Sequence, residues 1–149
     1  MDKIKRVLEH QIAQHHRDKQ LREYRDHQLQ QLCDLIESWI TPLTTVRWHQ
    51  MGADRLLHLA LKPDDTLVLR FAPQWQKNQR QVHISLSIFN AAQPRQRTLF
   101  RLAWHSKKQH WVIRSLKRKN HRFPALFYRR TFSKALFETC LIDFLHPEP

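Results

Sequence analysis

From residue 45 to residue 118 the sequence alternates between apolar and polar side chains with a period of two, and turn-forming residues interrupt it repeatedly. This period is typical of β-strands that have one face on a core and the other in water. Short connections favour antiparallel neighbours, because a parallel crossover needs a much longer segment. We therefore expect an antiparallel sheet of five to six strands in meander order, over residues 45–50, 55–61, 66–72, 82–89, 97–105 and 110–118, with longer polar loops at 73–79 and 90–96.

Helical patterns precede and follow this sheet. Residues 2–40 place apolar side chains at three- and four-residue steps, but the pattern lapses over residues 13–20, which leaves open whether they form one helix or two. A second helix is predicted over residues 124–145. Pro124 suits its first position, and Thr131 or Ser133 is suited to cap a shorter final segment.

These patterns predict the α+β fold class. The expected architecture is one domain over residues 1–149, formed by an N-terminal helical arm or scaffold (1–40), the antiparallel sheet (45–118) and a C-terminal helix (124–145).

Alternation also assigns each side chain of the sheet to one of two faces. The face predicted to form the core contains Val46, Trp48, Leu57, Leu59, Leu61, Leu67, Leu69, Phe71, Val82, Ile84, Leu86, Ile88, Phe100, Leu102, Trp104, Trp111 and Ile113. The opposite face is basic or potentially basic on every strand, with Arg47, His49, His58, Arg70, His83, Arg97, Arg101, His105, His110, Arg114 and Arg118. Because Leu56, Val68 and Leu99 share it, we expect the C-terminal helix to cover part of this second face.

The stretch Thr66–Phe137 contains sixteen Lys and Arg residues but no Asp or Glu. At the chain's average acidic content, a window of this length would hold about six. Residues 1–65 carry ten basic and ten acidic side chains and the last twelve residues carry three acids, so the formal net charge of +13 is the sixteen charges of this stretch less three. A field this one-sided attracts polyanions. It predicts a nucleic-acid partner, without distinguishing DNA from RNA or single from double strands.

The candidate binding residues come from the basic face and from a basic run that follows the last strand. Arg side chains match the geometry of phosphate, and a helix beginning at Pro124 would add backbone amides. We expect phosphate contacts from Arg97, Arg101, Lys107, Lys108, Arg114, Lys117, Arg118, Lys119, Arg122, Arg129 and Arg130. Trp75, in a polar loop, and Tyr128, within the basic run, are the candidates for stacking on bases.

Several functional classes are disfavoured. Gly52 is the only glycine, which excludes a P-loop or a dinucleotide-binding turn, since each needs several. There is no CxxC motif, and His105 and His110 flank a hairpin loop without an evident third ligand, so no metal or other cofactor is expected. A nuclease, the enzymatic alternative, needs carboxylates beside the basic surface. We therefore expect a non-enzymatic protein.

The basic surface also suits an acidic protein partner, in which case the protein is an interaction adaptor. Helix 2–40 is then suited to a second contact or to a homodimer. Membrane binding is disfavoured, because no window approaches 18 consecutive apolar residues and helix 2–40 is charge-balanced. The isolated Cys33 and Cys140 fit a reducing compartment, so a cytoplasmic location is expected.

Overall fold

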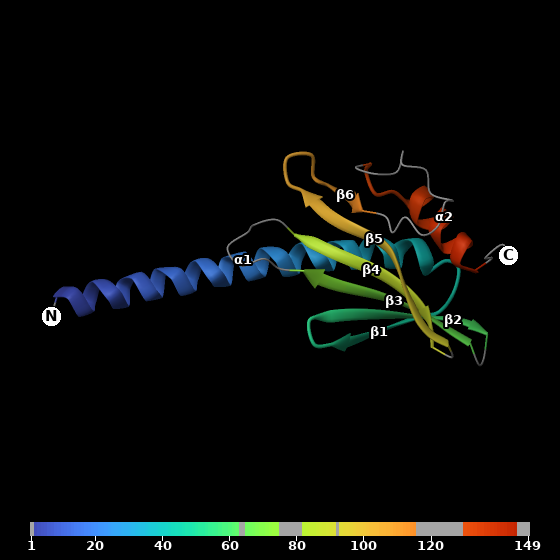
Figure 1. Ribbon diagram of the computed structural model, residues 1–149, viewed down its shortest axis with the longest axis horizontal. Helices are drawn as coiled ribbons and strands as arrows, with labels where there is room; N and C mark the ends of the chain where they lie inside the picture. The colour runs from blue at the N-terminus through green and yellow to red at the C-terminus, as the bar shows by residue number, and fades with distance from the viewer. Residues whose placement is uncertain (1, 63–64, 75–81, 92, 116–129, 146–149) are drawn as a thin grey trace.

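The computed structural model describes residues 2–62, 65–74, 82–91, 93–115 and 130–145. Helix α1 (Asp2–Ile40) is followed by six strands and then by helix α2 (Lys134–Leu145) (Figure 1). The strands form one antiparallel sheet in the order β1-β2-β3-β4-β5-β6, which confirms the α+β class and the meander. They are β1 (Val46–Met51), β2 (Asp54–Lys62), β3 (Asp65–Gln74), β4 (His83–Asn90), β5 (Gln93–His105) and β6 (His110–Ser115).

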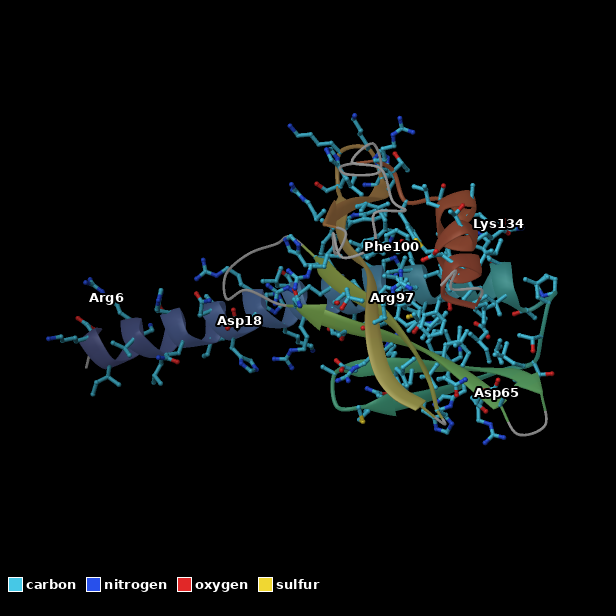
Figure 2. The ribbon with its side chains drawn as sticks, turned by 45° about the vertical axis from the view of Figure 1, so that its right-hand side comes forward. Arg6, Asp18, Asp65, Arg97, Phe100 and Lys134 are labelled. Atoms are coloured by element: carbon cyan, nitrogen blue, oxygen red, sulfur yellow. The ribbon has the colours of Figure 1, made fainter. Side chains whose placement is uncertain are left out.

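Helix α1 is a single α-helix of 39 residues, without a break over residues 13–20. Its buried side chains all lie in the last third, at Gln28, Leu29, Leu32, Cys33, Ile36 and Ile40. Residues 2–20, termed the arm, are exposed except for half-buried Gln14. Figure 1 shows the arm extending past the end of the sheet, and Figure 2 shows Arg6 and Asp18 along it, clear of the strands and of α2. Because the last third of α1 is held helical by its packing, the helix can extend through the arm without a new nucleation step.

The core lies between one face of the sheet and the two helices. The predicted core face is confirmed: its side chains pack with α1 and α2 in one cluster, apart from Leu61, which is 40% exposed. Trp39 of α1 packs against α2 and the residue run before it, since its ring centroid lies 5.6 Å from those of both Phe132 and Phe137. Both helices therefore occupy the same side of the sheet.

Two of the hairpin turns depend on a left-handed backbone conformation. Gly52, with φ of 61°, forms the two-residue connection of β1 and β2 with Ala53, a position where glycine is favoured. Gln109, with φ of 55°, ends the turn between β5 and β6. The predicted long loop at 90–96 is wrong, because Asn90 pairs with Gln93 and β5 begins there.

A β-bulge changes the alternation of β5. Phe100 pairs with Leu86, but the next pair joins Thr98 to Ser87, so Leu99 has no partner on β4. A bulge of this kind places two residues of one strand opposite one of the other. Residues of β5 before Leu99 consequently point to the face opposite from the one that simple alternation predicts.

Arg97 is the residue that this bulge displaces. It pairs with Ile88, whose side chain is fully buried in the core, so Arg97 lies on the helix side of the sheet. There its Nη2 donates to Oδ2 of Asp143 on α2 at 2.9 Å. Arg97 and Phe100 are both labelled on β5 in Figure 2. The prediction that Arg97 lies on the basic face is therefore wrong.

The C-terminal helix begins later than predicted. Oγ of Ser133 accepts a hydrogen bond from the Leu136 amide at 3.3 Å, which confirms Ser133 as the cap of a shorter helix. Residues 130–132 pair with β6 instead, through the Ile113 amide to the Arg130 carbonyl (2.9 Å) and the Phe132 amide to the Trp111 carbonyl (2.8 Å). The predicted positions 124–129 lie outside the described residues. Because α2 packs into the core, the expectation that it covers the basic face is also wrong.

Candidate nucleic-acid interface

The sheet face that points away from α1 and α2 is termed the outward face, and no described helix packs on it. Cross-strand pairing aligns Arg47 with His58 and Val68, and Ala72 with Ser85 and Arg101. Further members are His49, Leu56, Arg70, His83, Phe89, Ala103, His105, His110 and Val112. Arg114 has no partner on β5, because the register shifts there, and we assign it to this face because its charge acts on His83. The apolar members of the face are buried or half-buried, as Val68 shows with an exposure of 1%, whereas Arg47, His49, Arg101, His105 and Arg114 are exposed. The face thus presents mainly basic and polar groups to solvent.

The densest positive charge on the outward face lies over β4, β5 and β6. This hairpin patch consists of His83, Arg101, His105, Lys107, Lys108, His110 and Arg114. At its end the His105 and His110 rings stack at a centroid distance of 5.7 Å, and Nδ1 of His105 accepts the Lys108 amide at 3.2 Å. Arg101, Arg114, Lys107 and Lys108 are exposed, and none forms an ion pair within the described chain.

Three other described cations of the acid-free stretch, Arg70, Arg97 and Lys134, lie beside carboxylates. Nε of Arg70 donates to Oδ2 of Asp54 at 2.7 Å, so a carboxylate from the start of β2 neutralises this cation of β3 on the outward face. Arg97 is paired with Asp143 on the helix side, and Lys134 lies 3.8 Å from Glu138 on α2. The hairpin patch is therefore electrostatically distinct from its surroundings.

A second basic region lies at the free edge of the sheet, on β1 and β2. Here a groove of about 310 Å³, termed the edge groove, is lined by Thr45, Arg47, His49, His58, Ala60 and Thr66, together with Val46. The rings of His49 and His58 meet edge to face with centroids 4.4 Å apart. Arg47 is the direct cross-strand partner of His58 and is exposed.

Two histidines of the outward face are shifted toward their neutral form. Burial lowers the pKa of His58 below 6.5, and the neighbouring His49 and Arg47 lower it further. Burial also lowers the pKa of His83, with Arg114 adding to the effect. Both shifts result from desolvation and from positive neighbours, which disfavour another positive charge. An anion bound beside either ring would reverse the second contribution.

The predicted site residues divide into three groups. The structure brings Arg101, Lys107, Lys108 and Arg114 together in the hairpin patch and leaves Arg130 exposed beside β6. It removes Arg97 to the helix side. The remaining predicted contacts, namely Lys117, Arg118, Lys119, Arg122 and Arg129, and the stacking candidates Trp75 and Tyr128, lie outside the described residues.

The edge groove is absent from the predicted site. Alternation places Arg47, His49 and His58 on the correct face, but the predicted contacts all come from the acid-free stretch, which starts at Thr66. Charge counted along the chain could not find them, because residues 1–65 are balanced overall. The useful signal is strand register, which separates these three side chains from the acidic residues of α1.

Neither cysteine offers a reactive thiol. Burial raises the pKa of Cys33 to about 12, and burial likewise raises the pKa of Cys140 to about 12. A thiol that stays protonated is a poor nucleophile and a poor metal ligand. Across the described ranges, no three His, Cys, Asp or Glu side chains gather as the ligands of a metal ion.

Comparisons with known proteins do not add to this geometry. No protein-family model, no curated protein and no solved structure matches the chain. Among the described residues, neither α1 nor α2 has the length and apolar character that crossing a membrane requires.

Proposed function

We propose that the protein is a non-enzymatic nucleic-acid-binding protein, whose outward face contacts phosphates, and that it serves as an accessory factor in DNA or RNA processing. The observation that carries this proposal is the hairpin patch: exposed Arg101, Arg114, Lys107 and Lys108 have no carboxylate partner in the described chain. An ordinary solvated face mixes both signs of charge. Cations held together without counter-charges are the electrostatic footprint of a polyanion site.

The width of the outward face fits a short segment of one nucleic-acid strand. Arg47 on β1 and Arg101 on β5 are separated by four strand spacings across the sheet and by four residues along it, or roughly 23 Å. At the 3.4 Å rise of one strand in a duplex, this distance corresponds to about seven nucleotides. Phosphate contacts of this kind position a ligand without reading its sequence, so the proposed binding is of low sequence specificity.

A competition titration tests this function. The full chain is titrated with single- and double-stranded DNA and RNA of equal length at two salt concentrations. We expect binding that weakens steeply with salt, because each neutralised phosphate releases counterions. Affinity that does not change with salt would remove the proposal. A complex with an acidic protein that survives nuclease treatment, without any gel shift on DNA or RNA, would instead favour the adaptor.

Homodimerisation through the arm is a second proposed property. Ile4, Leu8 and Ile12 follow one another at four-residue steps and are 65%, 57% and 70% exposed. Such a row is an i±4 ridge, and two identical ridges pack at about −50° in the commonest class of helix crossing. The row is symmetric about Leu8, so a second copy fits it by a two-fold axis with Ile4 opposite Ile12.

The charges of the arm permit this contact, while those of the sheet oppose it. The arm (residues 2–20) carries five basic and three acidic side chains, so two arms repel each other weakly. A crossing at Leu8 also keeps the two basic sheets farther apart than a Debye length of about 8 Å. Sedimentation velocity over a range of concentrations tests the dimer. Leu8→Glu is expected to abolish concentration dependence, and an unchanged monomer peak at all concentrations of the native chain would refute it.

A cytoplasmic location forms part of the proposal. It is supported by the two free, buried thiols, which are typical of a reducing compartment.

A further inference from the structure

The edge groove combines three features of a phosphate site. It is concave, with a volume of about 310 Å³, near the lower limit for ligand pockets. It brings a permanent cation, Arg47, next to two imidazoles, His49 and His58. It also contains two hydroxyl groups, those of Thr45 and Thr66, and hydroxyl groups commonly donate to phosphate oxygens.

None of the positive groups of the edge groove forms an ion pair within the described chain. Of the nearby carboxylates, Asp54 is bonded to Arg70 and Asp65 accepts Nδ2 of Asn90 at 2.7 Å. Like charges directly opposite each other on neighbouring strands are destabilising. Arg47 and His58 nevertheless stand in that relation, and burial together with the neighbouring His49 and Arg47 lowers the pKa of His58.

An anion in the groove changes this balance. A phosphate oxygen between Arg47 and the imidazoles offsets the charge of Arg47 and accepts a hydrogen bond from a protonated ring. His58 then gains a proton when the anion binds, and by linkage the anion binds more tightly as pH falls. The groups that face His58 are Arg47 and His49 from β1, the Arg70–Asp54 pair, and Thr66 with neighbouring Asp65 from β3.

We infer that the edge groove is a phosphate-binding site in which Arg47, His49 and His58 hold one phosphate group and His58 takes up a proton. This inference rests on the proposed function for the origin of the ligand, which is a backbone phosphate at the β1 end of the bound strand. The hairpin patch and the edge groove then anchor opposite ends of one segment, on either side of the neutral Arg70–Asp54 pair.

The titration of the His58 ring tests the site directly. The ring proton signals of the full chain are followed by NMR from pH 5 to 8, in inorganic phosphate and in chloride at equal ionic strength. Phosphate is expected to raise the midpoint of His58 by about one pH unit, the size of shift that an adjacent opposite charge produces. Equal midpoints in phosphate and chloride would overturn the inference.

Matched variants separate the site from general charge. Arg47→Gln removes an exposed side chain of the groove, and Lys5→Gln removes the same charge from the exposed arm. Arg47→Gln is expected to abolish most of the phosphate-induced shift, whereas Lys5→Gln retains it. A full shift in Arg47→Gln would overturn the assignment. Circular dichroism on both variants confirms that the fold is intact.

A second titration, with decathymidylate, distinguishes this inference from the proposed function. Affinity is expected to rise between pH 7.5 and pH 5.5, and His58→Gln is expected to diminish that rise. If decathymidylate binds with the same pH dependence in His58→Gln and in the native chain, the groove is excluded while the nucleic-acid function stands. If His58 responds to phosphate but decathymidylate does not bind, the proposed function and the backbone origin of the ligand are both refuted.

Discussion

Arg97 and Arg101 lie four residues apart on β5, yet the structure assigns them to opposite faces, and this contrast yields a quantitative prediction. Arg101 is exposed on the outward face beside Arg114, whereas Arg97 is bonded to Asp143 on the helix side. Replacing Arg101 and Arg114 together by Gln should therefore weaken nucleic-acid binding. Replacing Arg97 by Gln should leave the electrostatic part of binding unchanged and destabilise the fold.

The magnitude follows from counterion release. Each phosphate contact contributes about −0.7 to the slope of log K against log salt for a single strand, and about −0.9 for duplex DNA. Loss of two contacts makes the slope shallower by about 1.4 or 1.8. Extrapolated from a common value at 1 M salt, this corresponds to an affinity loss of about 25-fold or 60-fold at 0.1 M. Arg97→Gln instead removes a charged hydrogen bond, which costs about 2 kcal/mol of unfolding free energy.

Fluorescence anisotropy at five salt concentrations measures the slopes, and urea denaturation measures the stabilities. The reasoning is refuted if Arg97→Gln reduces the slope as much as Arg101→Gln does. It is also refuted if the double variant at Arg101 and Arg114 keeps the native slope. Both results are interpretable only at temperatures where urea titration shows each variant to be folded.

Three further predictions concern the fold. Ser133→Ala removes the cap of α2 and should lower the unfolding free energy by about 1 kcal/mol in urea denaturation, whereas Ser133→Asp should retain it. Phe137→Ala opens a cavity beside Trp39 and should cost about 3–5 kcal/mol by the same measurement; a loss under 1 kcal/mol would contradict the described core. Cys33 and Cys140, whose pKa values are both raised to about 12 by burial, should react with a thiol reagent at pH 8 only after unfolding, and rapid reaction in the native chain would show that they are accessible.

The sheet was predictable because its strands obey one simple rule. Each strand has one apolar face, so a period of two fixed which residues enter the core, and short turns fixed the antiparallel order. The same rule failed at Leu99, because a bulge depends on how β4 and β5 fit together in space. No glycine marks the position in the sequence, and Arg97 was therefore assigned to the wrong face.

The C-terminal segment shows a different limit. Local preferences suggested a helix from Pro124, but residues 130–132 pair with the edge of β6, a partner that lies nearly twenty residues away in sequence. Tertiary pairing overrides local preference in such cases. Ser133, whose capping role depends on its immediate neighbours, and the end of the helix at Leu145 were foreseen correctly. For the candidate site, the sequence pointed to four of the cations that the structure gathers in the hairpin patch, but not to the edge groove, and the nucleic-acid ligand stays a prediction.

The length of α1 gives the protein a reach that its mass alone would not suggest. A helix of 39 residues is about 58 Å long, and the arm contributes about 28 Å of it beyond the packed segment. A second copy bound at the arm, as proposed, is therefore held at a distance from a nucleic acid bound on the outward face, and the two do not compete for space. The molecule has the geometry of a spacer, able to keep two bound objects apart at a separation set by the number of helical turns between them.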